Sequence, residues 1–217
     1  HSFGLQIDAG FGKADASNLT GDMDTYGIGG HLFARDPDRG LVGLYGHYVK
    51  LDFGFIELDS YVVGVEGEYY LDQYTFQVFA GMNQIDSSAR DKTYADLDFT
   101  AGYYLTDNMR FDAGVQHQFG ETFARVGFEA MLPQFDNNTS LYAKASIGSD
   151  ATDFRAGLRI HFGGESGKSL KDRHRQDDPF SRLFDFTGLC LDEFEYGYYS
   201  PNTCEGAGSY RPQEPLK

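Results

Sequence analysis

Residues 3–11 read Phe-Gly-Leu-Gln-Ile-Asp-Ala-Gly-Phe, an alternation in which every second side chain is apolar. Successive side chains of a β-strand point to opposite faces of the sheet, so this stretch predicts a strand with one apolar face and one polar face. Residues 154–162 repeat the pattern, with Arg155 and Arg159 at two of the intervening polar positions. Similar alternation recurs ten times over residues 3–162, so this part of the chain is predicted to be all-β.

The length and number of these stretches predict an architecture. A tilted strand of about 9–11 residues crosses the hydrocarbon layer of a bilayer, and bacterial outer-membrane barrels have an even number of antiparallel strands. We therefore expect a closed, up-and-down transmembrane β-barrel of ten strands, with the last strand paired to the first. The strands are predicted near residues 3–12, 25–35, 41–51, 60–71, 74–83, 93–105, 109–119, 122–132, 139–148 and 153–162.

The predicted connections alternate in length. Tight turns are expected at 36–40, 72–73, 106–108 and 133–138, whereas two longer connections, 13–24 and 84–92, are rich in polar residues and glycine. Short turns of bacterial barrels face the periplasm and long loops face outward, which places both ends of the barrel domain in the periplasm. The third strand is ambiguous, because two alternating sets of apolar side chains compete for its lipid-facing side.

Composition agrees with this class without identifying it. The chain has 217 residues, 16% of them aromatic, and a mean hydropathy of −0.45. A barrel strand needs apolar residues only at every second position, so a membrane protein of this kind has a polar average. The same alternation would suit a soluble barrel-shaped lipid carrier, which usually has a helical lid, but no helical periodicity precedes residue 163. The expected surroundings are outer-membrane lipid and lipopolysaccharide in a Gram-negative bacterium.

Charges of both signs fall on the predicted polar faces, which in a narrow barrel line the lumen. Buried charges persist only when they are paired, so a lumen filled with ion pairs is the first expectation. A thin pore lined by charges is the alternative. The expected network consists of Asp8, Glu66, Glu68, Asp96, Asp98, Arg110, Asp112, Arg125, Glu129, Lys144, Arg155 and Arg159. Arg155 and Arg159 are expected to pair with carboxylates such as Asp8 or Asp112.

Catalysis is considered and set aside. Asp96, Asp98 and His117 could imitate the acidic pairs and the histidine of omptin-type outer-membrane proteases. Those barrels extend far above the membrane on longer strands, and the chain has no motif of a hydrolase, a metalloprotease or a phosphate-binding loop. We expect no catalytic residue, no cofactor and no metal site. The net charge of −15 also disfavours binding to nucleic acid.

The chain changes character after the predicted barrel, residues 1–162. Residues 163–178 form a polar and basic linker, and residues 179–217 form a tail that we expect in the periplasm. Asp178 and Pro179 suit a helix start, and Phe180, Leu183 and Phe184 follow at helical spacing, so a short amphipathic helix is expected there.

Two further features of the tail indicate contact with a partner. Cys190 and Cys204 are the only cysteines, and in an oxidising periplasm they are expected to form a disulfide. The apolar side chains of the tail need a surface to cover them, which indicates docking to a protein partner or to another copy. The expected docking residues are Phe180, Leu183, Phe184, Phe194, Tyr196, Tyr198 and Tyr199.

Several stretches resemble a group of uncharacterised alphaproteobacterial outer-membrane proteins. They are residues 29–37 (Gly-Gly-His-Leu-Phe-Ala-Arg-Asp-Pro), 40–46, 64–71, 103–108 and the post-barrel motif 168–179, which runs from Lys-Ser-Leu to Asp-Asp-Pro. The post-barrel motif is the most specific part. The resemblance implies an outer-membrane barrel without an assigned activity and carries over no catalytic residue.

Three classes of function are compatible with these features. The first is a small structural or scaffolding barrel whose tail docks a partner. The second is a narrow, charge-lined, porin-like diffusion channel. The third, which the sequence favours least, is an outer-membrane enzyme or ligand carrier.

Overall fold

The fold is described from a computed structural model. It describes residues 2–16, 21–54, 56–88, 90–135, 137–149, 152–161, 167–177, 179–186 and 189. Cys190, Cys204 and the aromatic residues at 194–199 lie outside the described residues, and so does the predicted disulfide.

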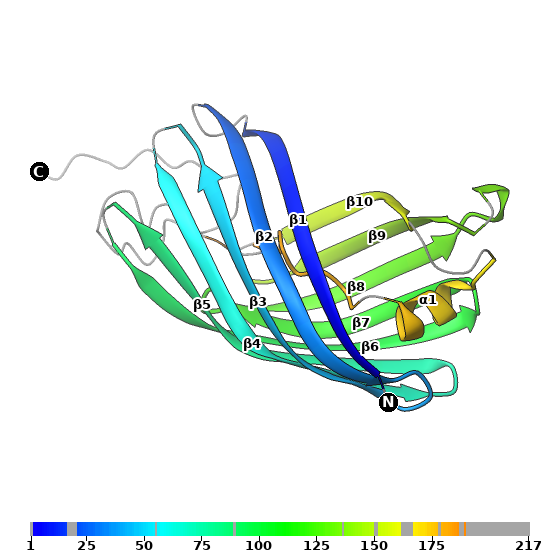
Figure 1. The fold of residues 1–217 in the computed structure, drawn as a ribbon. Coiled ribbons are helices and arrows are strands. Elements are labelled where there is room, and N and C mark those ends of the chain that lie inside the picture. Colours follow the sequence, from blue (N-terminus) through cyan, green and yellow to red (C-terminus); the bar gives the residue numbers. More distant parts are fainter. Residues whose placement is uncertain are drawn as a thin grey trace, which may run out of the picture.

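All ten predicted strands are present, and they form a single antiparallel sheet in chain order (Figure 1). The predicted all-β, up-and-down architecture is therefore confirmed. The strands are β1 (Ser2–Ala16), β2 (Gly21–Asp36), β3 (Gly40–Asp52), β4 (Glu57–Leu71), β5 (Tyr74–Ser87), β6 (Lys92–Thr106), β7 (Met109–Gln118), β8 (Glu121–Met131), β9 (Thr139–Ile147) and β10 (Thr152–Ile160).

The connections define two ends of the sheet. We call the end with the β2–β3, β4–β5, β6–β7 and β8–β9 connections the turn end, and the opposite end the loop end. Strand pairing continues further toward the loop end than predicted: β5 runs to Ser87 and β6 begins at Lys92, so little of the expected long loop 84–92 remains. Both β1 and β10 have their outer termini at the turn end, as the even number of strands requires.

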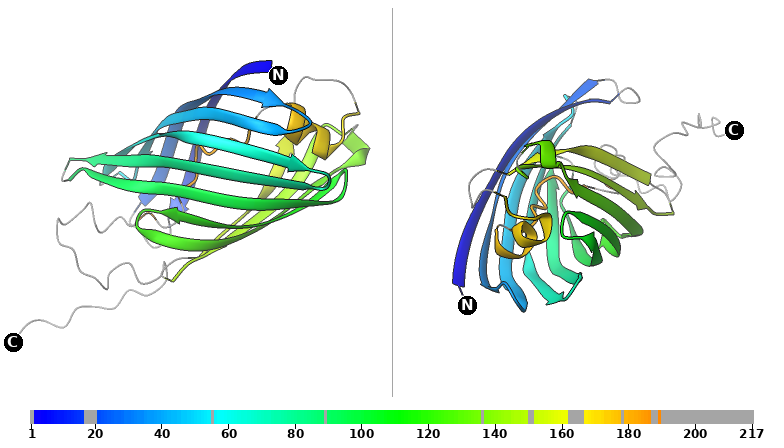
Figure 2. Two further views of the ribbon diagram at one scale, coloured as in Figure 1. Left: turned by 90° about the horizontal axis from the view of Figure 1, so that it is seen from below. Right: turned by 90° about the vertical axis from the view of Figure 1, so that its right-hand side faces the viewer.

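Closure of the barrel is not seen in this structure. The sheet is a half-barrel whose edges are β1 and β10, and β10 pairs with β9 alone among the described strands. Figure 2 shows the curved sheet with a short helix and an extended segment in its concave side. The expected pairing of β10 with β1 is thus replaced by an open seam, which the chain following β10 enters.

The two faces of the sheet differ sharply in chemistry. The convex face carries rows of exposed apolar side chains, such as Val63 on β4, which is 67% exposed. The concave face carries the charged and amide side chains. Strand β3 resolves its ambiguity in this arrangement, because Val42 and Leu44 are exposed on the convex face whereas Tyr45 and Val49 are buried on the concave face.

The single α-helix among the described residues, α1, spans Leu170–Gln176 and lies at the turn end. A short 3₁₀ helix, Pro133–Phe135, lies in the β8–β9 connection. Ser169 caps it by accepting a hydrogen bond from the Asp172 amide, and Leu170 is fully buried. The predicted helix from Pro179 is wrong: residues 179–186 contain one turn and no helix. The described residues contain no helix with the length and apolar character needed to span a membrane.

Candidate functional site in the concave face

An extended segment of the chain runs through the concave side of the sheet. We call residues 179–186 together with Leu189 the inner segment. It follows α1, which is anchored at the turn end by Asn108 and Asp107: the Leu170 amide donates to Asn108 Oδ1 at 3.0 Å and the Lys171 amide donates to the Asp107 carbonyl at 2.9 Å. The inner segment thus begins beside the turn end.

The other end of the inner segment reaches the loop end. Leu183, which is 4% exposed, packs in a buried cluster with side chains from β3, β4 and β5. Phe186 and Leu189 pack against the same cluster. The buried members are Val49, Leu51, Phe53, Ile56, Leu58, Ile85 and Leu183. The chain therefore crosses the concave face from one end of the sheet to the other.

The inner segment also bridges the open seam. On the β1 side, Gln6 Nε2 donates to the Pro179 carbonyl at 3.2 Å. On the β10 side, Arg155 Nη1 donates to the Phe184 carbonyl at 3.1 Å. The two edge strands, which do not pair with each other, are therefore linked through the same short stretch of chain.

A glycine makes room for this stretch on β1. A Cβ atom added at Gly10 would lie 2.3 Å from the Phe184 ring, well inside van der Waals contact. The space beside β1 is therefore shaped to the Phe184 side chain. Phe184 and Leu183, expected to dock a partner, instead pack against the chain's own sheet.

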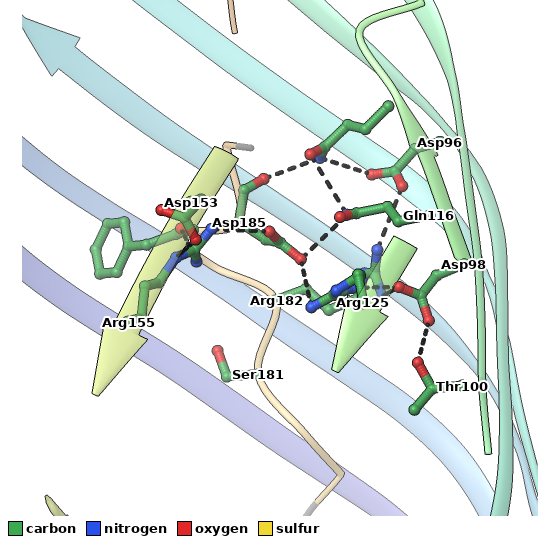
Figure 3. Close-up of polar contacts among 12 residues, drawn as sticks. Asp96, Asp98, Thr100, Gln116, Arg125, Asp153, Arg155, Ser181, Arg182 and Asp185 are labelled. Carbon is green, nitrogen blue, oxygen red and sulfur yellow. Dashed lines mark hydrogen bonds and ion pairs between the residues drawn. The ribbon is translucent and has the colours of Figure 1, made fainter. Parts of the chain in front are cut away.

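Asp185 is the centre of a charged network at the middle of the concave face (Figure 3). Its carboxylate lies 3.5 Å from Arg125 Nη2 and 3.3 Å from Arg155 Nη2, and it accepts a hydrogen bond from Gln116 Nε2 at 3.1 Å. The Asp185 carbonyl accepts a further bond from Gln118 Nε2 at 2.9 Å. β7, β8 and β10 are therefore all attached to one side chain of the inner segment.

The charges around Asp185 decide its protonation. Burial alone would raise the pKa of Asp185, but the positive charges of Arg125, Arg182 and Arg155 outweigh burial and hold its pKa well below the ordinary value. Asp185 is thus an anion that the cationic side of the concave face requires.

Arg182 provides the opposite charge to the acidic pair on β6. Its Nη2 lies 3.3 Å from Asp96 Oδ1, its Nη1 lies 3.9 Å from Asp98 Oδ2, and its guanidinium covers the Phe79 ring at 4.2 Å. Asp98 also forms a close ion pair with Arg125. Neighbouring residues of the inner segment, Arg182 and Asp185, therefore neutralise opposite charges of the sheet.

Apart from Lys144, the remaining predicted charges have partners within the sheet. His31 is buried between Asp8 Oδ2 at 3.3 Å and Glu66 Oε1 at 2.9 Å. Arg110 bonds to Asp112 at 2.6 Å, and Glu68 accepts bonds from the Tyr70 hydroxyl and from Gln77. Arg159 lies 2.8 Å from Glu129.

Arg155 and Arg159 lie on the concave face and pair with carboxylates, as predicted, but the two carboxylates named as examples are wrong. Both arginines bond to groups of the concave face, but neither pairs with Asp8 or Asp112. The physical reason is the open seam: β10 is not a neighbour of β1, and the inner segment lies between them. Asp8 is taken by His31 instead.

His174 joins α1 to this network. Its Nδ1 lies 3.0 Å from the Tyr104 hydroxyl and 3.3 Å from Arg110 Nη1. An arginine can only donate, so Nδ1 is an acceptor and the ring is neutral, with Nε2 directed toward Glu129 Oε2 at 3.5 Å. Burial lowers the pKa of His174 to about 4; Glu129 opposes this shift, and Arg110 and Arg159 add to it.

Phe180, the third predicted docking residue, lies among cations of the concave face. The guanidinium carbons of Arg110 and Arg159 are each 5.2 Å from its ring centroid, and Lys144 Nζ is 5.9 Å away. The negative face of an aromatic ring attracts such cations. The ring therefore helps to hold like charges together inside the sheet.

A cavity of about 120 Å³ remains beside the inner segment. Its walls include Lys144, Arg110, Asp112 and Thr100 from the sheet and Phe180 from the inner segment. No group of three or more metal-ligating His, Cys, Asp or Glu side chains gathers within the part of the chain that the structure describes. The cavity is thus a small polar space without a candidate metal centre.

The arrangement considered for catalysis does not form. Asp96 and Asp98 are buried on the concave face and paired to arginines, as described above. His117 lies between the concave-facing residues Gln116 and Gln118, so it points to the convex face, where it bonds to Thr122 at 3.0 Å. The histidine and the acidic pair therefore lie on opposite faces of the sheet.

Sequence reasoning missed several residues of this site. Arg182, Asp185 and His174 lie in a region assigned to a linker and a periplasmic tail, and Gln116 and Gln118 were not singled out. Ser169 and Asp172 have the spacing of a helix-capping pair and could have located α1. No local pattern marks Arg182 or Asp185, because their charged partners lie at least 30 residues away in the chain.

Comparisons with known proteins add no relative. No protein-family model matches the chain. A comparison with curated proteins and another with solved structures also gave no match. The function is therefore inferred from the geometry of the fold and of the concave face.

The neutral state of His174 predicts a pH dependence. Because its folded pKa is near 4 and its ordinary value is 6.5, the unfolded chain binds the extra proton first. The contribution of neutral His174 to the free energy of unfolding is therefore fully present above pH 6.5 and is lost as the pH falls from 6.5 toward 4. His174→Asn keeps a hydrogen-bond acceptor but cannot titrate. Between pH 6.5 and 4 this variant should therefore lose less stability than wild type, by on the order of 1–3 kcal/mol.

The measurement is the free energy of unfolding in urea at a series of pH values, in detergent micelles. His117→Asn is the matched control and should keep the wild-type pH dependence. If wild type and H174N lose stability in parallel between pH 6.5 and 4, the ring of His174 is not the neutral acceptor inferred above.

Proposed function

We propose that this chain is a small outer-membrane β-barrel with a structural or scaffolding role. The observation that carries the proposal is the distribution of side chains over the two faces. Apolar residues cover the convex face of all ten strands, and the charges gather on the concave face around a buried core of ion pairs. A water-soluble sheet of this curvature would need the reverse, whereas a bilayer solvates an apolar outer face.

Closure of the sheet is part of this proposal. In a bilayer, the unpaired backbone groups of β1 and β10 would lack hydrogen-bonding partners, and each such group costs several kcal/mol (about 2–7 for an amide). The inner segment already links the two strands through Gln6 and Arg155. Pairing of β10 with β1 around the inner segment would give a barrel without free edges.

The course of the inner segment suggests which side each end faces. With the turn end in the periplasm, α1 closes the periplasmic mouth and Leu189 lies at the outer mouth. This revises the expectation of a wholly periplasmic tail. We propose that Phe194, Tyr196, Tyr198 and Tyr199, which lie outside the described residues, supply apolar surface for a partner or another copy.

The proposed role is structural because the interior is occupied. The ion pairs of Arg182 and Asp185 fill the middle of the concave face, and the described residues beside them form no catalytic constellation. We propose that the protein is not an enzyme and that lipid and lipopolysaccharide surround it. We also propose kinship with the alphaproteobacterial barrels that it resembles, whose specific motif corresponds here to α1 and its flanks.

A narrow diffusion channel is the second candidate, and the polar cavity of about 120 Å³ is the observation that favours it. In this alternative the inner segment would leave the lumen to let solute pass. Planar-bilayer conductance separates the two candidates: a structural barrel gives no stable conductance steps, whereas a channel gives them.

Membrane insertion predicts a depth-dependent effect of charge on the convex face. Val63→Arg, at an exposed position on β4, should destabilise the protein by about 2–4 kcal/mol if it lies near the bilayer midplane. Thr93→Arg, near the loop end of β6, should cost only about 0–1 kcal/mol. The measurement is urea unfolding from lipid vesicles. Equal, near-zero costs at both positions would place the convex face in water.

The course of the inner segment predicts that the C-terminus is accessible from outside the cell. An epitope tag added after Lys217 should bind its antibody on intact cells, because the chain reaches the loop end at Leu189. A tag inserted between Asp38 and Arg39, in the β2–β3 turn, should bind only after the outer membrane is permeabilised. A C-terminal tag that stays as protected as the turn tag would contradict this orientation.

A further inference from the structure

Almost every charged group that lines the cavity beside the inner segment has a partner. Its carboxylates and guanidinium groups are partnered: Asp112 with Arg110, Asp98 and Asp185 with Arg125, and Glu66 with His31. Glu68 accepts two neutral hydrogen bonds, and Glu129 and Arg182 have the partners described above. Each charge of the cavity wall is thus compensated or hydrogen-bonded, with one exception.

Lys144 is the exception. Within the described part of the chain, its ammonium group makes no hydrogen bond and no ion pair. Its Nζ lies 5.9 Å from the centroid of the Phe180 ring. Charged groups of both signs act on it, namely the cations Arg125 and Arg159 and the anions Asp185 and Asp112. Those anions are already bonded to arginines. Lys144 therefore carries a charge that the protein does not neutralise.

An uncompensated ammonium group in a confined space is costly. The space beside it is large enough for a guest, since about 10–15 Å³ of this measure accommodates one water molecule. It is too small for a drug-sized ligand, which needs roughly 300–1,000 Å³. The ammonium group of Lys144 would be compensated by one small anion with a single negative charge.

We propose that this cavity is a binding site for a small monovalent anion, of the size of formate, with Lys144 as its counter-charge. The Phe180 ring and the Ser181 backbone of the inner segment form one wall of the site, so the anion lies against the segment that fills the lumen. The proposal does not depend on membrane insertion, because both the cavity and the charges belong to the folded chain.

The test is isothermal titration of sodium formate into the full-length protein in detergent micelles. The ionic strength is held constant with sodium gluconate, whose monovalent anion is much bulkier than formate. Wild type should show one saturable site per chain. Lys144→Met, which keeps the apolar stem and removes the charge, should weaken the apparent affinity at least tenfold, whereas Lys13→Met, at an exposed position on β1, should leave it unchanged.

Thermal unfolding provides a second readout that does not depend on the heat of binding. Formate should raise the melting temperature of wild type and of K13M above its value in gluconate, and should not raise that of K144M. A wild-type protein without saturable formate binding would overturn the proposal, and so would a K144M variant that binds formate as tightly as wild type. Failure of this site would leave the barrel proposal unchanged.

Discussion

The structure depends on the pairing of charges on one face of a sheet. Ten neighbouring strands direct acids, arginines and amides to the concave side, where the desolvation of an unpaired charge would cost several kcal/mol. The sheet cannot satisfy this requirement alone. Arg125 on β8 and Arg155 on β10 each pair with one acid of the sheet and share Asp185 as a second partner. The cation that pairs with Asp96 is Arg182. The inner segment supplies both of these partners within four residues, Arg182 and Asp185.

The same segment satisfies the apolar part of the interior. Toward the loop end the concave face carries Val49, Leu58 and Ile85, and Leu183 completes their cluster. Toward the turn end α1 buries Leu170 and places His174 against Tyr104. The inner segment therefore matches the interior in charge near its middle and in apolar character near one end. These contacts hold it along its length. The filled interior is why a structural role is favoured over an open channel.

Much of the sheet could be predicted from the sequence because alternation is local. The alternation within each strand predicts which of its side chains face the interior. Residues a few positions apart are therefore enough to predict the ten strands, their antiparallel order and the inward direction of Arg155 and Arg159. Partner identity is different in kind. Arg155 finds Asp185 only because β10 and β1 are separate edges with a segment between them, and no short-range pattern encodes that arrangement.

The tail illustrates the same limit. The spacing of Phe180, Leu183 and Phe184 suits one face of a helix, but it also suits an extended chain that turns once at Leu183. The interior decides between the two, since the extended form lets Arg182 and Asp185 reach opposite walls. The helix that does form, α1, uses the capping pair Ser169 and Asp172, a signal available in the sequence.

Solvent access of Leu183 is the most direct measure of the filled interior. Leu183→Cys, in a chain whose Cys190 and Cys204 are replaced by serine, should resist a maleimide reagent while folded in micelles and react fully in denaturant. Gln176→Cys, at an exposed position in the last turn of α1, should react at once. We predict that position 183 alone is protected from the maleimide. Equally fast labelling at both positions in the folded protein would contradict a filled interior.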